Sequence, residues 1–321
     1  MNIIGVDIGF SSCKVTLGNE YGEISKKFKF SSLIGITKKI DAVENSKIKK
    51  YDDNYYMVGD DAQHLPSANM IDITEYKNLE YYAPLLLQHA IEKCGVEPDI
   101  VVTGLSIAQI GNSGYFQAQL EKYTIDDKEY IHNTVYVLPQ GAGAKLTVDR
   151  YGARFPEEQK EFNGNKNYII CDIGFNTIDY LLVNNGKTDP NLFNADENAG
   201  IMKISKQIAQ EVNKQFKRQI TLQEAREVID TGFYKLRGKK HDFKEFVENI
   251  KKEYLKDLLK DIEAKYPGFL DKADYVFVCG GGSTLFKSTD DQFIRIPFND
   301  HEYYNSLGEY LFGIMQIKKG Q

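Results

Sequence analysis

One tetrapeptide occurs twice in this sequence, and it carries residues whose types and spacing are suited to phosphate chemistry. The letters DIGF stand at residues 7–10 and again at 172–175, each time after an apolar run. Glycine lets a backbone approach a ligand closely, and the N–H groups of a turn are suited to phosphate oxygens. A carboxylate beside phosphate requires a hard cation, and magnesium is commonly held by one or two carboxylates with phosphate oxygens. The repeat predicts such a site; the alternative is two ordinary β-turns with solvated aspartates.

Polar residues after each copy add to this prediction. Ser11 and Ser12 follow the first copy, and Thr177 follows the second, so each supplies hydroxyl donors for phosphate oxygens. Lys14 stands where the second copy has Asp179, and a lysine there would offset phosphate charge. The repeat of strand, turn and second strand indicates two half-molecules that are built alike.

A triple glycine follows the apolar run at 275–278. The segment 279–286 reads CGGGSTLF and is expected to open a helix. Three glycines form a flat surface that suits a base or ribose, and a helix N-terminus favours phosphate. The segment is neither a Walker P-loop nor a G-x-G-x-x-G fingerprint, and the alternative is a flexible turn.

Two further segments combine small residues with a polar side chain. Residues 139–144 read PQGAGA, and Gln140 follows an expected strand, where it could orient an attacking water as glutamine does in some nucleotide hydrolases. The alternative is a simple loop. Gly308, in the segment NSLG at 305–308, lowers helix stability, so we expect close packing to explain it.

The apolar patterns place these motifs at the ends of expected strands or the starts of expected helices. Apolar runs predict strands at 2–8, 14–17, 23–30, 55–58, 100–105, 135–138, 168–173, 178–183 and 275–278. Helical apolar spacing predicts helices at 79–93, 144–151, 201–212, 222–229, 243–262 and 303–315. The polar stretch at 157–167 is the expected crossing between domains.

Composition excludes several classes of protein. The chain has 321 residues, 42% of them hydrophobic and 27% charged, which is the balance of a globular protein. No apolar run reaches the roughly 18 residues of a membrane helix, and Asp7 interrupts an N-terminus that does not resemble a signal peptide. The net charge of −6 argues against broad nucleic-acid binding by the whole chain. The four cysteines form no C-x-x-C pair, so we expect reduced thiols, no zinc site and a cytoplasmic location.

The order of these motifs resembles the actin-type ATPase fold, which actin, bacterial cytoskeletal actins, sugar kinases and the large heat-shock chaperones share. Residues 7–14 resemble its first phosphate loop, and residues 171–179 resemble its second. Residues 140–144 and 305–308 resemble its two connecting segments, and residues 278–286 resemble its adenosine motif. The five motifs span the chain in the order of that superfamily.

Within the superfamily, the short chain and the stretch YMVGDDA at 56–62 are most similar to plasmid-segregation actins of the ParM/StbA type and related archaeal actins. The resemblance implies an ATPase that polymerises into nucleotide-dependent filaments and separates plasmid or other DNA copies through a DNA-binding adaptor. Its partners would be copies of itself and that adaptor, with no direct DNA contact and no membrane. The alternatives are a small-molecule kinase of the same fold and a non-polymerising nucleotide-binding assembly protein.

The implied fold is α/β and actin-like, a duplicated ribonuclease H-like arrangement with two similar domains flanking a nucleotide cleft. Domain I would comprise residues 1–157 and 302–321, with a smaller inserted subdomain near 31–75. Domain II would comprise residues 158–301, with a helical subdomain near 198–268.

The resemblance also assigns roles to individual residues. Asp7 and Asp172 would face the magnesium ion, and Gln140 and Asp172 would position or activate the attacking water. The ParM pattern often has glutamate where Gln140 stands, so the choice between Gln140 and Asp172 for water activation stays open. ATP or ADP, or the guanine nucleotides in their place, would contact Gly9, Phe10, Ser11, Ser12, Lys14, Gly174, Phe175, Asn176, Thr177, Gly200, Lys203, Gly280, Gly281, Gly282 and Ser283.

Two remaining features have an ordinary interpretation beside a functional one. Cys13, Cys171 and Cys279 fall in or beside the expected loops, where a cysteine is more often a small apolar filler than a redox group. A group of basic residues precedes the longest expected helix and forms either a solvated face or a filament or partner contact: Lys235, Arg237, Lys239, Lys240 and Lys244.

Overall fold

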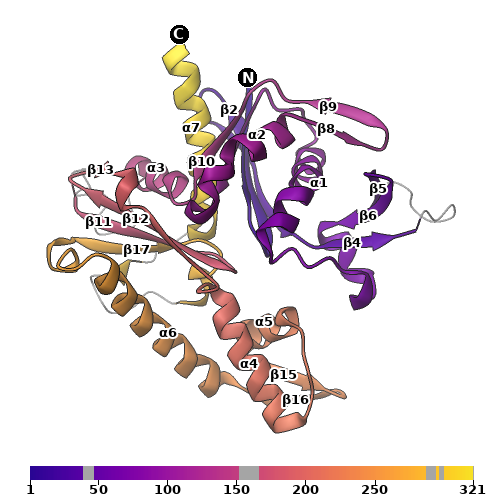
Figure 1. Cartoon of the computed structure of the whole chain (residues 1–321), viewed down its shortest axis with the longest axis vertical. Helices are drawn as coiled ribbons and strands as arrows, with labels where there is room; N and C mark the ends of the chain where they lie inside the picture. The colour runs from indigo at the N-terminus through magenta and orange to yellow at the C-terminus, as the bar shows by residue number, and fades with distance from the viewer. Residues whose placement is uncertain (39–46, 152–165, 287–293, 296–299, 321) are drawn as a thin grey trace. The chain divides into compact units, whose positions relative to one another are not determined.

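The structure is a computed structural model with two compact units (Figure 1). Unit 1 comprises Met1–Arg154 and Glu302–Gln321, and unit 2 comprises Phe155–His301. The expected crossing at 157–167 lies largely outside the described residues. The structure describes residues 1–38, 47–151, 166–286, 294–295 and 300–320.

A five-stranded mixed sheet forms the centre of unit 1. Its order is β10-β7-β1-β2-β3. The central strand β1 (Asn2–Ile8) pairs in parallel with β7 (Ile100–Leu105), which pairs in parallel with β10 (Val135–Pro139). On its other side β1 pairs antiparallel with β2 (Ser12–Asn19), which continues into β3 (Ile24–Ser31). The continuous apolar sequence of β1 and β7 fits strands that are buried on both faces.

Helices cover both faces of this sheet. On one face, Ile4 of β1 belongs to the core that includes α1 (Tyr76–Cys94). On the other face, Ile3 packs with residues of α7 (Tyr304–Gly320). Successive strand residues point to opposite faces, so β1 contributes to both cores. Two shorter helices, α2 and α3, complete unit 1 at Ser113–Glu121 and Ala142–Tyr151.

Smaller elements extend unit 1. A three-stranded sheet has the order β4-β6-β5, with β4 at Ile34–Thr37, β5 at Ile48–Tyr51 and β6 at Asn54–Val58. Strands β8 (Lys122–Ile125) and β9 (Lys128–Ile131) form a separate hairpin. Single 3₁₀ segments occupy Gly59–His64, Ser67–Asn69 and Ile107–Asn112, and a further one, His301–Tyr303, begins at the last residue of unit 2.

Unit 2 repeats the sheet order of unit 1. The strand β11 (Tyr168–Ile173) pairs in parallel with β17 (Tyr275–Cys279), which pairs in parallel with β18 (Ile294–Arg295). On its other side β11 pairs antiparallel with β12 (Thr177–Asn184), which pairs with β13 (Lys187–Thr188). A further strand, β14 (Asn194–Glu197), also pairs with β12. The repeated tetrapeptide therefore ends the central strand of each sheet.

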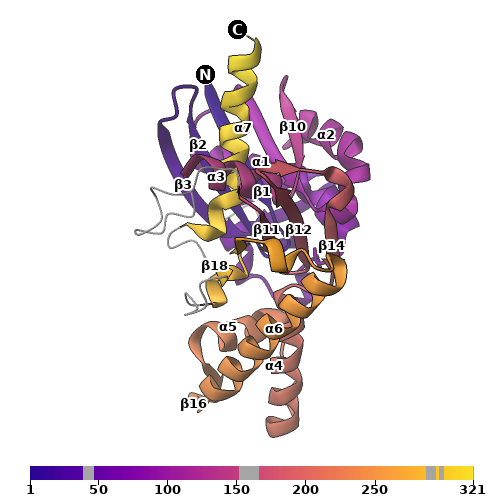
Figure 2. The same ribbon diagram turned by 90° about the vertical axis from the view of Figure 1, so that its left-hand side faces the viewer.

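Three helices gather into one group in unit 2 (Figures 1 and 2). They are α4 (Ile201–Phe216), α5 (Leu222–Thr231) and α6 (Lys244–Lys265), and their apolar faces share a core with β11 and β12. Strands β15 (Phe233–Leu236) and β16 (Lys239–Asp242) form a two-stranded ribbon at the end of this group, away from the sheet of unit 2 (Figure 1).

One expected helix is shorter in the structure. After the triple glycine, the described residues form only a 3₁₀ turn at Ser283–Leu285. Among the described residues, no helix is both long and apolar enough to cross a membrane.

Candidate functional site

A buried ion pair joins the two strands of the first hairpin. Asp7 and Lys14 are register partners on β1 and β2, and the Lys14 Nζ lies 3.2 Å from the Asp7 carboxylate. Asp7 is 2% exposed and Lys14 is 7% exposed. Burying a charge is costly unless it is paired and hydrogen-bonded, and here each charge compensates the other. The sequence placed both residues in one site, and the structure brings them together.

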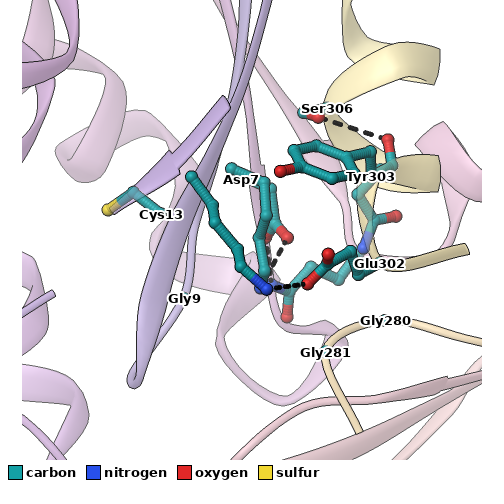
Figure 3. A network of polar contacts seen from close by, with 12 residues as sticks. Asp7, Gly9, Cys13, Gly280, Gly281, Glu302, Tyr303 and Ser306 are labelled. Carbon is teal, nitrogen blue, oxygen red and sulfur yellow. Dashed lines mark hydrogen bonds and ion pairs between the residues drawn. The ribbon is translucent and has the colours of Figure 1, made fainter. Parts of the chain in front are cut away.

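Gln140 completes a three-residue cluster with this pair. Its Nε2 donates to the Asp7 Oδ1 at 3.3 Å, and its backbone N–H donates to the carbonyl oxygen of Leu105 at 2.8 Å. The parallel strands β1 and β10 end at the same edge of the sheet, which brings their following residues together. In Figure 3, Asp7 lies on the side of the sheet that faces Ser306 of α7, whereas the Cys13 sulfur points to the other side.

The turn after β1 is held by its neighbours. Ser32 Oγ donates to the carbonyl oxygen of Gly9 at 2.6 Å, and the Ser32 N–H donates to the carbonyl oxygen of Ser11 at 3.0 Å. A Cβ at Gly9 would lie 3.4 Å from the Lys14 Nζ. Phe10 packs against the core on the α1 side, and Ser12 begins β2. The loop is therefore anchored at its carbonyl groups.

Asn305 caps the helix that follows Gln140. Its Oδ1 accepts from the N–H groups of Gly141 at 3.1 Å and Ala144 at 3.2 Å. The first N–H groups of a helix have no partner within it, and a side-chain oxygen satisfies them. Here the cap comes from α7 rather than from the residue before the helix. Asn305 stood in a predicted segment, but its capping role has no local sequence signal.

The second hairpin has two carboxylates where the first has an ion pair. Asp172 and Asp179 are register partners on β11 and β12, and they are 4% and 1% exposed. The Thr177 hydroxyl donates to the Asp179 carboxylate at 3.1 Å. The predicted correspondence between Lys14 and Asp179 is confirmed by the strand register.

The triple glycine lies against the second tetrapeptide. Gly280 has a positive φ of 82°, and a Cβ there would overlap the Asp172 carboxylate. The Gly282 N–H donates to the carbonyl oxygen of Ile173 at 2.7 Å, and a Cβ at Gly282 would lie 2.8 Å from that oxygen. Glycine is required at both positions because the two backbones touch. Asp172 and the glycine loop therefore belong to one site in unit 2.

The start of α4 also packs against the second tetrapeptide. The N–H groups of Gly200, Ile201 and Met202 donate to carbonyl oxygens of the loop at residues 174–176, at 3.1, 3.1 and 2.8 Å. A Cβ at Gly200 would lie 2.6 Å from the carbonyl oxygens of Gly174 and Phe175. Gly200 was predicted as a ligand contact, and in the structure it packs against this loop.

Two predicted residues of unit 2 have further contacts. Lys203 is exposed, and its Nζ lies 3.5 Å from the Asp257 carboxylate. Ser283 Oγ donates to the carbonyl oxygen of Gly280 at 2.6 Å, and it shares a hydrogen bond of 2.6 Å with His301 Nδ1. The His301 carbonyl oxygen in turn accepts from the Gly280 N–H. Sequence reasoning missed His301 because an isolated histidine in a polar stretch carries no signal.

The cysteines beside these loops are packed in the cores. Burial raises the pKa of the Cys13 thiol to about 12, and burial also raises the pKa of Cys171. A thiol with a raised pKa is a poor nucleophile and metal ligand at neutral pH. Their burial and raised pKa agree with the interpretation of these cysteines as small apolar fillers.

The cluster around Asp7 contains oxygen atoms of the kind that magnesium prefers as ligands. Magnesium binds oxygen ligands and keeps several of its waters, so one carboxylate and a neighbouring amide oxygen suffice from the protein. Asp7 and Gln140 present a carboxylate and an amide at one sheet edge. Among the described residues, no group of three or more His, Cys, Asp or Glu could hold a metal ion. The Asp7 carboxylate faces Lys14 and the Gln140 amide nitrogen, so it would hold a magnesium ion through that ion's waters.

Two family models match consecutive parts of the chain. The model described as the N-terminal domain of actin-like proteins matches residues 5–143. The model described as the C-terminal part of the archaeal actin homologue MreB-like matches residues 170–290. Each match contains one of the two tetrapeptides. No match was found among the curated protein sequences.

Solved structures of similar fold cover nearly the whole chain. The native crystal structure of Ta0583, an archaeal actin homologue, is 18% identical, with a TM-score of 0.73 over 98% of this chain and 99% of that one. The Ta0583 complex with ADP is 17% identical, with the same TM-score and coverage. A 15-stranded ParM filament from Clostridium botulinum is 16% identical, with a TM-score of 0.75 over 98% and 99%. These similarities show the fold.

Proposed function

Because the chain belongs to the actin-like proteins, we propose that it hydrolyses a nucleoside triphosphate and couples this reaction to assembly of filaments. The observation that carries the proposal is the buried cluster of Asp7, Lys14 and Gln140. A cation, a carboxylate and a neutral amide at one strand edge are the groups that phosphate, hydrated magnesium and water require. The ADP complex of the similar Ta0583 structure supports a nucleotide as the ligand.

In unit 1, the three residues have separate tasks. The Lys14 ammonium binds phosphate oxygens and offsets their charge, and Asp7 accepts from the waters around magnesium. The Gln140 amide orients the water that attacks the terminal phosphorus. The water oxygen bonds to that phosphorus while the bond to the bridging oxygen breaks, so the products are a nucleoside diphosphate and inorganic phosphate. When bound, magnesium neutralises charge on the phosphate oxygens.

In unit 2, the buried Asp172 is the second group assigned to magnesium and to the attacking water. We assign the adjacent glycine loop, Gly280–Gly282, to the adenine and ribose, because it lies directly beside Asp172. We assign the phosphate contacts of the loop after β11 to Asn176 and Thr177. Gly200 and Lys203 mark the ribose side of this site.

Filament assembly is the second part of the proposal. The nucleoside triphosphate favours the filament, and hydrolysis destabilises it. A 15-stranded ParM filament has a similar fold, which supports self-association as the use of this chemistry. The cargo that we propose is plasmid or other DNA, held through a DNA-binding adaptor because the chain is acidic.

Substitution of the two water-positioning candidates tests the hydrolysis. Gln140→Ala and Asp172→Ala should each lower phosphate release by about 10²-fold or more, as is typical for a positioned proton-transfer or water-orienting group. Nucleotide binding should persist in both variants. The matched control is Gln215→Ala, which changes an exposed glutamine on α4 and should leave turnover unchanged.

The same assays identify the role of the metal-facing residue. Asp7→Ala should weaken nucleotide binding in the presence of magnesium more than in its absence. Parent-like phosphate release in both the Gln140 and the Asp172 variants would remove them from the mechanism. Phosphate transfer to a panel of sugars would instead establish a kinase.

A further inference from the structure

A strongly basic ribbon lies at one end of unit 2. Residues 214–244 contain nine Lys and Arg against four Asp and Glu, a balance of +5, so the rest of this −6 chain carries −11. The β15–β16 ribbon and the start of α6 hold five of these cations at exposed positions: Lys235, Arg237, Lys239, Lys240 and Lys244. Such a separation of charge within one chain favours contact between oppositely charged surfaces.

These five cations are available to a partner. None of them forms an ion pair with a carboxylate of the described residues, whereas other exposed lysines of unit 2, such as Lys203 and Lys214, do. Two of the five lie over the Phe233 ring instead, with Lys244 Nζ at 4.5 Å and Lys240 Nζ at 5.6 Å from its centroid. That contact holds the two lysines in place and leaves their charge unneutralised.

The ribbon also has an apolar base. A hollow of about 240 Å³ lies between α5 and β15. It is lined by Val228, Phe233 and Tyr234, with Lys235 and Lys240 from the ribbon and with Glu224, Glu227 and Thr231 from α5. An apolar centre surrounded by charged groups is the usual composition of a protein–protein contact. Nucleic-acid contacts have no need of such a hollow, so it favours a protein surface as the partner.

Unit 1 carries a complementary acidic surface at two neighbouring hairpin turns. Asp52 and Asp53 form the β5–β6 turn, and Asp126 and Asp127 form the β8–β9 turn, all four exposed. The turns lie side by side, because two hydrogen bonds join them. The Lys50 N–H donates to the Asp126 carboxylate at 2.7 Å, and the Asp126 N–H donates to the carbonyl oxygen of Lys50 at 2.9 Å. Lys50 also pairs with Asp127, and Lys128 follows it, so the two turns carry four carboxylates beside two lysines.

We infer that the basic ribbon of one copy of this chain docks on the acidic turns of a second copy. The two surfaces lie on different units of the chain, so one copy can offer its ribbon to one neighbour and its acidic turns to another, which is a heterologous contact. A heterologous contact that does not close on itself produces an open filament. The inference rests on the proposed assembly function and names the surfaces that perform it. It also predicts an assembly that weakens with salt, as the Debye length falls from about 10 Å at 0.1 M to about 3 Å at 1 M.

Charge reversal with rescue tests the contact. Lys239→Glu/Lys240→Glu should raise the protein concentration needed for pelleting with magnesium and ATP by at least about tenfold, since like charges would then face each other. Asp53→Lys/Asp127→Lys should do the same. The variant with all four changes should assemble at the parent concentration. The matched control, Lys206→Glu/Lys252→Glu, makes the same charge change at exposed positions of α4 and α6 and should leave assembly unchanged.

The outcomes that overturn the inference differ from those that overturn hydrolysis. Assembly of the ribbon variant at the parent concentration rejects the ribbon, and loss without rescue in the fourfold variant rejects the acidic turns as its partner. Loss of binding to a fluorescent DNA duplex, with assembly intact, would assign the ribbon to nucleic acid. Sedimentation velocity of the nucleotide-free parent at low salt provides a second readout. A parent that neither pellets nor self-associates there also rejects the contact, while phosphate release judges hydrolysis separately.

Discussion

Gly143 on α3 and Gly308 on α7 lie in direct contact where the two helices cross. A Cβ at Gly308 would overlap the carbonyl oxygen of Gly143, and a Cβ at Gly143 would lie 2.6 Å from the carbonyl oxygen of Asn305. The close packing predicted for Gly308 is therefore confirmed. The same crossing places the Asn305 side chain at the N-terminus of α3, directly after Gln140.

This crossing predicts a large penalty for a single methyl group. Gly308→Ala should lower the free energy of unfolding by about 1–3 kcal/mol, because an added methyl group in a packed interior forces the backbone apart. Gly114→Ala is the matched control, since Gly114 lies in α2 with open space around it. That change should raise stability by up to about 1 kcal/mol through higher helix propensity. Urea unfolding followed by circular dichroism measures both, and equal effects would contradict the packing argument.

The Asp7–Lys14 pair predicts strong energetic coupling. Lys14→Met leaves a buried carboxylate without its cation, which typically costs about 3–5 kcal/mol of stability. Asp7→Asn in the same molecule removes the stranded charge, so the double variant should lose less than the sum of the single losses. The exposed pair of Lys122 and Glu129 is the control and should show almost no coupling. A double-mutant cycle with additive losses at Asp7 and Lys14 would contradict a buried pair.

His89 predicts loss of stability at acidic pH. Burial lowers the pKa of this imidazole to about 4, and the nearby Lys93 and Lys49 act in the same direction. The unfolded chain takes up the proton near pH 6.5, so the folded state is stabilised above that pH and loses this advantage as the pH falls toward 4. Burial also lowers the pKa of His132, so both histidines act in the same direction.

His89→Gln should therefore flatten part of this pH dependence. Between pH 7 and pH 5 the parent should lose on the order of 2 kcal/mol more than the variant. Urea unfolding at the two pH values gives the four free energies that are needed. An identical pH dependence in parent and variant would show that His89 does not titrate as its burial requires.

The burial of the cysteines predicts that the native protein has no reactive thiol. All four are buried, and burial raises the pKa of Cys94 to about 11 and that of Cys13 to about 12. At pH 8 a disulfide reagent such as DTNB should react slowly with the native protein and rapidly with four thiols after unfolding. Rapid stoichiometric labelling of a native thiol would revive a redox role.

The sequence was sufficient for the elements that bury a continuous or periodic apolar pattern. The strands β1, β7 and β11 were predicted at their observed bounds, and α4 to α7 were predicted within a few residues of theirs. The actin-like α/β fold is confirmed by the family models and the similar structures. Tertiary burial and local pattern agree in these elements.

Short strands were missed because a run of four residues is too brief to show a clear apolar period. The ribbon strand β16 reads Lys-Lys-His-Asp, so it was interpreted only as a basic cluster, and the β8–β9 hairpin was not predicted. The β15–β16 turn also places Arg237 at a positive φ of 47°, which no propensity argument favours. Strand β8 is nevertheless anchored in the core of unit 1 through Tyr123 and Ile125, and β15 in that of unit 2 through Tyr234.

Only part of the candidate site could be predicted from the sequence. The repeat predicted that Lys14 and Asp179 hold equivalent positions, and the pairing of Asp7 with Lys14 and of Asp172 with Asp179 agrees with this. Contacts between residues far apart in sequence left no local signal, as with the Asn305 cap and His301. The assignment of individual residues to nucleotide and metal stays a prediction.

The coupling of nucleotide hydrolysis to filament assembly is tested by following both processes in one sample. Right-angle light scattering is recorded after addition of magnesium with ATP or GTP, while phosphate release is measured at the same time. A filament whose assembly is coupled to hydrolysis should give a rise in scattering that decays as phosphate appears. Phosphate release without any rise in scattering would contradict coupling to filaments, and the absence of both would contradict the proposed function as a whole.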